Sequence, residues 1–211
     1  MEGPAGPLEV LVDLPAGVDM GADLVICHPH PLHGGTMHNK VVHTLARAAR
    51  DEGMRAVRFN FRGVGRSAGT HDQGVGEVDD LLAVVDGLAR EAGRPCLLAG
   101  FSFGAWIAAA AAARLADAGR PPLALLLVAP PVFYPGFDSL PALPLPVEVF
   151  MGDDDEVVDA AAVRDWVRST PSAPHLRRFP ATHFFHGQLS AVKDATAEWL
   201  RASLPRAAAG Q

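Results

Sequence analysis

The chain has 211 residues, of which 49% are hydrophobic, and a formal net charge of −6 at pH 7. This length and composition predict a single globular domain over residues 1–206 and a flexible tail over residues 207–211. The acidic balance and the lack of a Lys/Arg cluster argue against nucleic acid as a partner, because phosphate binding requires a basic surface. The first residues lack the pattern of a secretory signal, and no apolar stretch is long enough to cross a bilayer. We therefore expect a cytoplasmic protein without a membrane partner, whose oligomeric state the sequence does not determine.

Short apolar runs alternate along the chain with longer stretches of helical periodicity. This alternation predicts an α/β fold, in which a mostly parallel, twisted sheet of about seven to eight strands carries helices on both faces. The strands are predicted, in chain order, over residues 8–14, 23–27, 54–61, 95–100, 123–128, 147–151 and 175–179, with a further strand near 17–21 as an option. The helices are predicted over residues 40–52, 75–91, 103–118, 160–169 and 188–204. Ligands of such sheets bind at the carboxyl ends of the strands, and the unusual residues of this chain follow those ends.

One serine lies between two glycines in Gly100-Phe101-Ser102-Phe103-Gly104, directly after a predicted buried strand and before an alanine-rich helix. This context is that of a nucleophile elbow, a sharp strand-to-helix turn that exposes a serine hydroxyl. Glycines are needed on both sides because a side chain two residues from the serine would collide with the turn. Ser102 is therefore the candidate nucleophile.

A serine hydroxyl needs a base to take its proton, and the base needs a carboxylate that fixes its tautomer. Both types of residue follow Ser102 at later strand ends. The strand at 147–151 is followed by the aspartates 153–155, and the strand at 175–179 is followed by His183 and His186. Spacing alone does not choose among the aspartates. His183 is the favoured base and His186 the alternative.

At this point the chain resembles the α/β-hydrolase superfamily, and most closely its small capless bacterial esterase branch, which is similar to dienelactone hydrolases and serine aminopeptidase-like hydrolases. The resemblance extends from about residue 24 to residue 200. In that family the acid is the third residue after the glycine of the acidic loop, and the base is the histidine before paired phenylalanines, which implies Asp155 and His183. Besides the elbow, the resemblance is carried by segments 28–31 (His-Pro-His-Pro), 34–37 (Gly-Gly-Thr-Met), 60–67 (Asn-Phe-Arg-Gly-Val-Gly-Arg-Ser), 152–155 (Gly-Asp-Asp-Asp) and 182–185 (Thr-His-Phe-Phe).

Acyl transfer also requires two donors for the negative charge on the carbonyl oxygen. The elbow supplies the backbone N–H of Phe103. The second donor is expected from the loop after residue 27, where Pro29 and Pro31 have no N–H, and the family resemblance favours His30.

Two other motifs in the chain are typical of different chemistry. The histidines His28, His30 and His33, with His38 beyond them, approach the HxHxDH pattern of metallo-hydrolases, but Leu32 stands where the pattern requires aspartate. The segment 63–68 matches the GxGxxA dinucleotide fingerprint but is followed by a loop instead of a helix. We therefore expect neither a metal nor a cofactor, and we interpret 63–68 as a tight turn.

The segment between residues 128 and 147 is where capped family members insert their cap, and here it is too short and too rich in proline to form one. We therefore expect an open site without a large cap domain. An apolar acyl pocket is predicted from Phe133, Tyr134, Phe137 and Leu140.

The predicted function is a serine hydrolase that cleaves small carboxylic esters through an acyl-enzyme. The alternative from another class is a non-catalytic binding protein in which the elbow persists as architecture. Peptidase, thioesterase and acyltransferase activities would use the same residues, so the sequence does not separate them from an esterase.

Overall fold

The computed structural model describes residues 1–134, 137, 143–171 and 173–204. Its centre is a seven-stranded sheet in the order β3-β5-β4-β6-β7-β8-β9. The strand β3 is antiparallel to β5, and the other neighbours are parallel. The strands are β3 (Val10–Asp13), β4 (Asp23–Cys27), β5 (Arg55–Phe59), β6 (Cys96–Phe101), β7 (Leu125–Val128), β8 (Val147–Gly152) and β9 (His175–Phe179). The predicted fold class is therefore confirmed.

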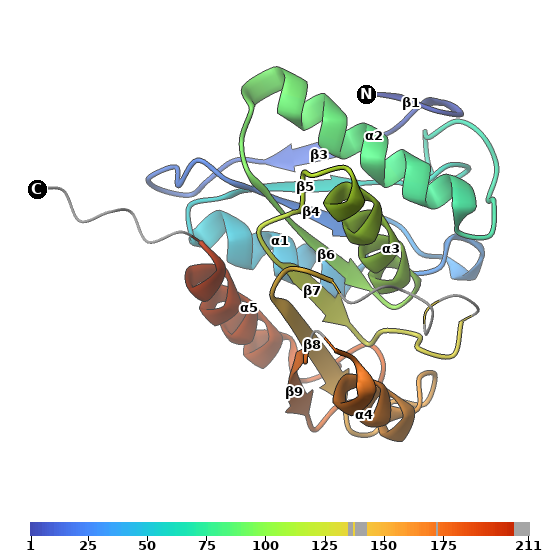
Figure 1. Cartoon of the computed structure of the whole chain (residues 1–211), viewed down its shortest axis with the longest axis vertical. Coiled ribbons are helices and arrows are strands. Elements are labelled where there is room, and N and C mark those ends of the chain that lie inside the picture. The colour runs from blue at the N-terminus through green and yellow to red at the C-terminus, as the bar shows by residue number, and fades with distance from the viewer. Residues whose placement is uncertain (135–136, 138–142, 172, 205–211) are drawn as a thin grey trace, which may run out of the picture.

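Helices cover both faces of this sheet (Figure 1). They are α1 (Lys40–Asp51), α2 (Val75–Ala92), α3 (Phe103–Asp117), α4 (Ala160–Ser169) and α5 (Leu189–Ser203). The helices α1 and α5 pack against each other, α2 packs against α3, and α4 contacts β8 and β9. A short 3-10 helix, Pro31–His33, follows β4. All five predicted helices are present, with ends that differ from the predicted ones by no more than one residue.

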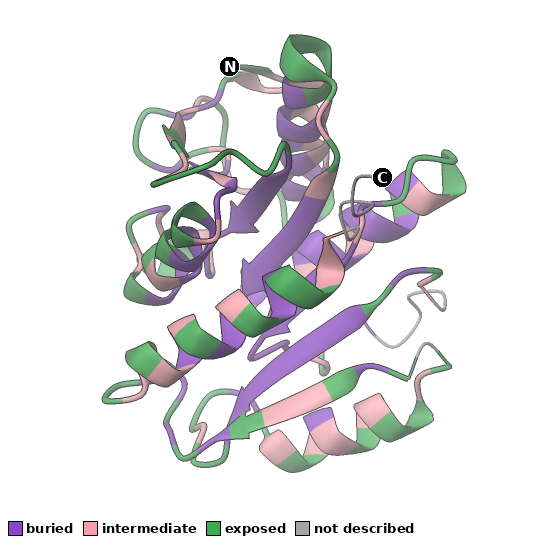
Figure 2. Ribbon diagram, turned by 90° about the vertical axis from the view of Figure 1, so that its left-hand side faces the viewer, coloured by how far each residue is buried: buried purple, intermediate pink, exposed green. Residues whose placement is uncertain are grey.

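The core lies at the middle of the sheet, where strands are covered on both faces (Figure 2). Every residue of β4 and β8 is buried, whereas the edge strand β9 buries only its last residue fully. Strands that are covered on both faces consist of continuous apolar runs, and for this reason they could be predicted from the sequence. The helix α3 is buried along most of its length because it contacts β4, β6 and β7 on one side and α2 on the other.

Two strands are shorter than predicted. The strand predicted over 8–14 is β3, which spans Val10–Asp13, and the strand predicted over 54–61 is β5, which spans Arg55–Phe59. A small hairpin of two strands with two residues each, β1 (Glu2–Gly3) and β2 (Gly6–Pro7), precedes β3. Residues 17–21, where a further strand was possible, form a loop. Beyond Phe59, the ladder with β3 continues for one more backbone hydrogen bond, and a side-chain contact then replaces it. Asn60 N–H donates to Glu9 O (2.9 Å), and Phe61 N–H donates to the ring of His28 (3.1 Å). The predicted tail, 207–211, lies outside the described residues.

Buried polar contacts fix the loop between β5 and α2. The buried carboxylate of Asp80 accepts three hydrogen bonds from Arg62, one from its backbone and two from its guanidinium. The buried carboxylate of Glu77 accepts the backbone N–H groups of Asp72 (2.9 Å) and Gly74 (2.8 Å). The segment 63–68 is a turn, with Gly63 and Gly65 at positive φ, and α2 begins only at Val75. This agrees with the predicted tight turn.

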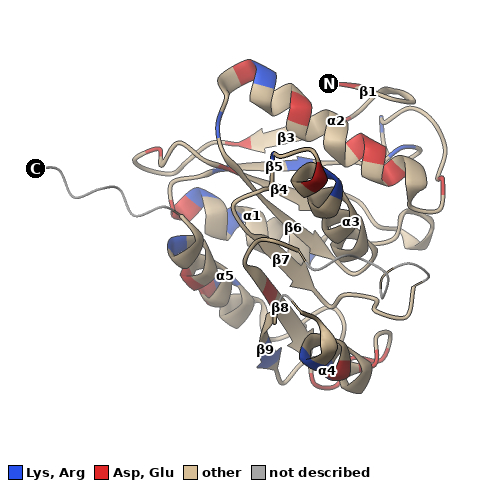
Figure 3. Ribbon diagram, viewed as in Figure 1, with Lys and Arg blue, Asp and Glu red and all other residues tan. Residues whose placement is uncertain are grey.

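Acidic and basic side chains are interspersed over the helices (Figure 3). Among the described residues, no helix combines the length and the hydropathy needed to cross a membrane.

Candidate active site

The elbow joins β6 directly to α3, with Ser102 between them at φ 55° and ψ −121°. This backbone conformation is rarely occupied by residues other than glycine, and its cost is accepted only where surrounding structure enforces it. The residues around the turn enforce this conformation. A Cβ on Gly100 would collide with the carbonyl oxygen of Gly104, and a Cβ on Gly104 would collide with the carbonyl oxygens of Cys27 and His28. The glycines therefore allow both the sharp turn and its close approach to the loop after β4.

The structure places His183 beside the elbow. His183 follows β9, and its Nε2 lies 3.1 Å from Ser102 Oγ. The imidazole is almost fully buried and packs against the rings of Phe101 and Phe184, whose centroids lie 5.0 and 5.2 Å away. Its backbone N–H donates to Glu156 Oε2 (3.1 Å). These contacts hold the ring in one orientation, with Nε2 toward the serine.

Asp155 lies on the other side of that imidazole. Its Oδ2 is 2.8 Å from His183 Nδ1, and its Oδ1 accepts the backbone N–H groups of Val157 (2.9 Å) and Val158 (2.8 Å). The carboxylate is fully buried, and these hydrogen bonds offset the cost of removing its charge from water. An ionised Asp155 requires a proton on Nδ1, so Nε2 presents its lone pair to the serine hydroxyl.

The other candidates for the catalytic acid and base do not lie next to Ser102. Asp153 is exposed and pairs with Arg178 at 2.6 Å, and Asp154 is exposed. His186 is exposed, and its ring lies near that of Phe184. Of the three aspartates and two histidines in these loops, Asp155 and His183 are the pair that is joined to the serine.

The two residues of the predicted oxyanion hole lie close together at the elbow. Phe103 is the first residue of α3, where a backbone N–H has no partner within the helix. His30 belongs to the loop after β4, which starts beside the elbow because Cys27 pairs with Gly100 in the sheet. The ring centroids of His30 and Phe103 are 4.8 Å apart. His30 O accepts the N–H groups of His33 and Gly35, so the loop is folded back on itself.

His28 has a structural role in this loop. It is fully buried, its Nδ1 lies 2.6 Å from Pro29 O, and its Nε2 accepts the N–H of Phe61 at 3.1 Å. A neutral ring with the proton on Nδ1 satisfies both contacts, and burial lowers the pKa of His28 to about 4. Since both nitrogens are engaged, His28 has no lone pair for a metal. Within the described ranges, no group of three or more His, Cys, Asp and Glu side chains is arranged to hold a metal ion.

The buried neutral His28 predicts a loss of stability in acid. Its pKa is lower in the folded state than its ordinary value of 6.5, so the unfolded state binds the proton more readily. Its contribution to the free energy of unfolding is therefore complete above pH 6.5 and is lost as the pH falls toward about 4. This shift corresponds to roughly 3 kcal/mol.

Denaturant unfolding at several pH values tests this with His28→Gln. The variant should be less stable at neutral pH, because it loses the contact with Pro29 O. Its free energy of unfolding should fall by about 2–3 kcal/mol less than that of the wild type between roughly pH 7 and pH 4. Identical pH dependence in both proteins would contradict the assignment of a buried neutral imidazole.

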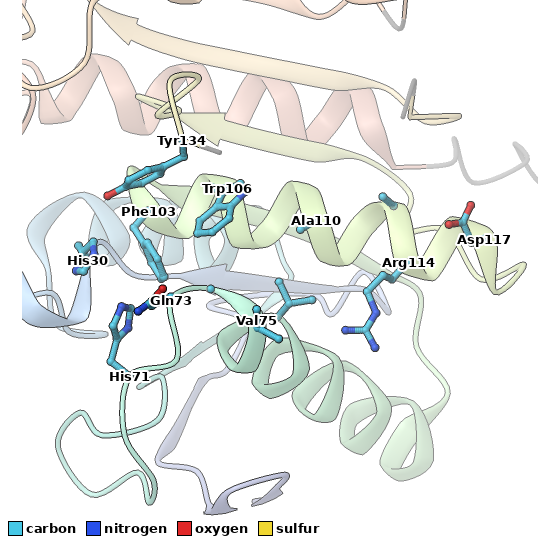
Figure 4. A pocket seen from close by; sticks show the side chains of 13 residues that line it. His30, His71, Gln73, Val75, Phe103, Trp106, Ala110, Arg114, Asp117 and Tyr134 are labelled. Carbon is cyan, nitrogen blue, oxygen red and sulfur yellow. The ribbon is translucent and has the colours of Figure 1, made fainter. Parts of the chain in front are cut away.

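A cavity of about 820 Å³ lies beside the elbow, between α3 and the start of α2 (Figure 4). Its floor is formed by one side of α3. The end next to the elbow is formed by the loops that contain His30 and His71. The lining residues are His30, His71, Gln73, Gly74, Val75, Val78, Phe103, Trp106, Ala110, Ala113, Arg114, Asp117 and Tyr134.

The described residues of the predicted acyl pocket lie in different places. Tyr134 lines the cavity. Phe133 does not, and its side chain is 59% exposed. Phe137 is fully buried and packs edge to face on Trp166 of α4, so it belongs to the core. Leu140 lies outside the described residues. Trp106 and Ala110, which line the cavity, are not among the predicted pocket residues, although their spacing on one face of the predicted helix is a signal for such a surface.

Known proteins share this fold. The model of the alpha/beta hydrolase family matches residues 24–211. An α/β serine hydrolase homologue from Coxiella burnetii is 45% identical, with a TM-score of 0.88 and 95% of each chain covered. An α/β serine hydrolase without lid from Xanthomonas campestris is 42% identical, with a TM-score of 0.90 and 97% of this chain and 93% of that chain covered.

An uncharacterised protein from Rickettsia prowazekii is 36% identical over 187 residues, which are 83% of this chain and 77% of that protein. The family match covers most of the chain, and the segment between β7 and β8, residues 129–146, is too short for a large cap. The chain therefore belongs to the alpha/beta hydrolase family, as a member without a large cap.

Proposed function

We propose that this protein is a serine hydrolase that cleaves carboxylic esters of small molecules through an acyl-enzyme intermediate. The observation that carries the proposal is the hydrogen-bonded chain from Asp155 through His183 to Ser102, with distances of 2.8 and 3.1 Å. Similarity to the serine hydrolase homologue from Coxiella burnetii and to the serine hydrolase from Xanthomonas campestris supports the reaction class.

In the first half of the reaction, Ser102 Oγ attacks the ester carbonyl carbon while His183 Nε2 takes the hydroxyl proton. The negative charge on the carbonyl oxygen is stabilised by the backbone N–H groups of Phe103 and His30. Asp155 stabilises the imidazolium without taking its proton. His183 then gives the proton to the leaving alkoxide, so an alcohol departs and the acyl group stays on Ser102.

In the second half, water attacks the acyl carbon while His183 Nε2 takes a proton from it. The bond to Ser102 Oγ breaks, His183 returns the proton to Oγ, and the carboxylic acid leaves. The same residues serve both halves because proton transfer to and from Nε2 is reversible. The fixed orientation of the buried imidazole supplies the positioning that each transfer needs.

A substrate panel with one acyl group and three leaving groups tests the reaction class. We expect p-nitrophenyl acetate to be hydrolysed fastest, the acetyl thioester of a small thiol more slowly, and p-nitroacetanilide, the corresponding amide, slowest. This order follows from the leaving groups, because a phenolate and a thiolate can depart without the proton that an amine nitrogen must first receive from His183. Preference for the amide would contradict the esterase proposal and favour a peptidase.

A further inference from the structure

The cavity beside the elbow is an elongated groove, not a round pocket. Its floor consists of Phe103, Trp106, Ala110 and Arg114, which follow one another along a single side of α3 (Figure 4). With a rise of 1.5 Å per residue, this side of the helix runs for about 17 Å from Phe103 to Arg114. The groove therefore starts at a predicted oxyanion residue and leads away from it.

The groove changes in chemistry along its length. Near the elbow, polar side chains lie beside the rings of Phe103 and Tyr134, whereas the middle of the groove is apolar. The polar residues are His30, His71 and Gln73, and the middle is formed by Val75, Val78, Trp106, Ala110 and Ala113. Its far end carries the charged side chains of Arg114 and Asp117. A long apolar middle section matches a hydrocarbon chain better than it matches a sugar or a charged ligand, because apolar contact is what it offers.

Local packing gives the groove its wall. A Cβ on Gly74 would collide with the indole ring of Trp106, so the absence of a side chain at this position lets the indole lie against the backbone before α2. Gly74 also has a positive φ of 95°, and its N–H is held by the buried carboxylate of Glu77. The position of Trp106 is thus fixed by the same contacts that start α2.

The side of the elbow on which the groove lies decides which half of an ester it accepts. The leaving alcohol must lie next to His183 Nε2, from which it receives its proton. None of the described groove residues comes from the loops after β8 and β9, which carry Asp155 and His183. In the sheet, β6 lies between β4, which leads to His30, and the strands that lead to His183. The groove is therefore on the acyl side.

Several large apolar side chains are exposed in the loops around the site. Exposed apolar side chains follow five strands whose carboxyl ends share one edge of the sheet with Ser102. They are Leu32, Val75, Phe133, Val157 and Phe184, with exposed fractions from 41% to 70%.

From these observations, and resting on the proposed hydrolase function, we propose that the groove along α3 binds the hydrocarbon chain of the acyl group. The preferred substrates are esters with an extended, unbranched apolar acyl chain, larger than the small acyl groups that the sequence suggested. The alcohol side is not held by this groove, so selectivity depends on acyl length and much less on alcohol length.

Two ester series measure the two sides separately. In the first, p-nitrophenyl acetate, butyrate and octanoate vary the acyl chain. In the second, ethyl, butyl and octyl acetate vary the alcohol. For the wild type, kcat/KM should rise along the acyl series by up to about fourfold per methylene, which is the transfer free energy of one buried CH₂, and should change little along the alcohol series.

The variant Ala110→Trp places an indole across the groove, about 10 Å along the helix from Phe103. It should lower the octanoate-to-acetate ratio of kcat/KM by about tenfold or more. Val75→Asp is a second variant, which introduces a charge at an exposed position where a helix start favours an acidic residue, so the fold is preserved. It should lower the same ratio. Ala116→Trp, at a half-buried alanine of α3 outside the groove, is the matched control and should retain the wild-type ratio.

The outcomes separate this inference from the hydrolase proposal. Unchanged ratios in both Ala110→Trp and Val75→Asp, or a wild type that prefers acetate, would overturn the acyl groove and leave the hydrolase proposal standing. A shift along the alcohol series instead of the acyl series would overturn the assignment of sides. No turnover of any ester by the wild type would overturn the hydrolase proposal itself.

Discussion

Ser102→Ala should lower kcat for ester hydrolysis by about 10⁴-fold or more while the protein remains folded. The substitution removes only the Oγ that lies 3.1 Å from His183 Nε2. The backbone of the elbow keeps its support, because the N–H of residue 102 still donates to Val128 O (2.8 Å) and the two glycines are unchanged. Steady-state kinetics and thermal unfolding measure the two expectations together.

Ser190→Ala, at an exposed serine at the start of α5, is the matched control and should have wild-type kinetics. Retention of ester hydrolysis by Ser102→Ala within about tenfold of the wild-type rate would rule out this serine as the nucleophile. A variant that is inactive because it has unfolded is recognised by its lost thermal transition and does not count as support.

The second large effect is expected at Asp155. Asparagine has the same shape as aspartate, and its carbonyl oxygen can still accept the N–H groups of Val157 and Val158, as Oδ1 does now. Its NH₂ group then faces His183 Nδ1, which must become an acceptor and leave the ring proton on Nε2. An Nε2 that carries a proton cannot take one from Ser102. Asp155→Asn should therefore lower kcat by about 10⁴-fold near neutral pH with little loss of stability.

The neighbouring aspartates provide the comparison for this variant. Asp154 is exposed, so Asp154→Asn should keep kcat within about twofold of the wild type. If Asp155→Asn and Asp154→Asn had the same modest effect, the imidazole would not depend on Asp155 for its tautomer, and the proposed acid would be wrong.

Much of the fold could be predicted because local patterns carry it. Buried parallel strands read as apolar runs, and the helices between them show their own periodicity. The elbow is local in part: the steric conflict at Gly100 is with Gly104 in the same turn, whereas the conflict at Gly104 is with Cys27 and His28 of the loop after β4. Since parallel strands end at the same edge, the sequence could place Ser102 and the loops with the acid and the base near one another.

The remaining features depend on contacts between distant segments. Which aspartate faces His183 is decided by the turn over residues 155–158, and spacing alone left three candidates. Phe137 looks like a pocket residue in a proline-rich loop, yet it packs under α4 on Trp166. The backbone just after β5 is held by His28, whose ring accepts the N–H of Phe61 from 33 residues away. None of these contacts has a periodic signal.

The central claim is that Ser102 is a nucleophile activated by His183, and covalent labelling with a fluorophosphonate measures this directly. The wild type should take up one phosphonyl group, which peptide mass mapping locates on Ser102, and His183→Ala should be labelled at least about 10³-fold more slowly. Labelling at another residue, or an equal rate in His183→Ala, would contradict the account.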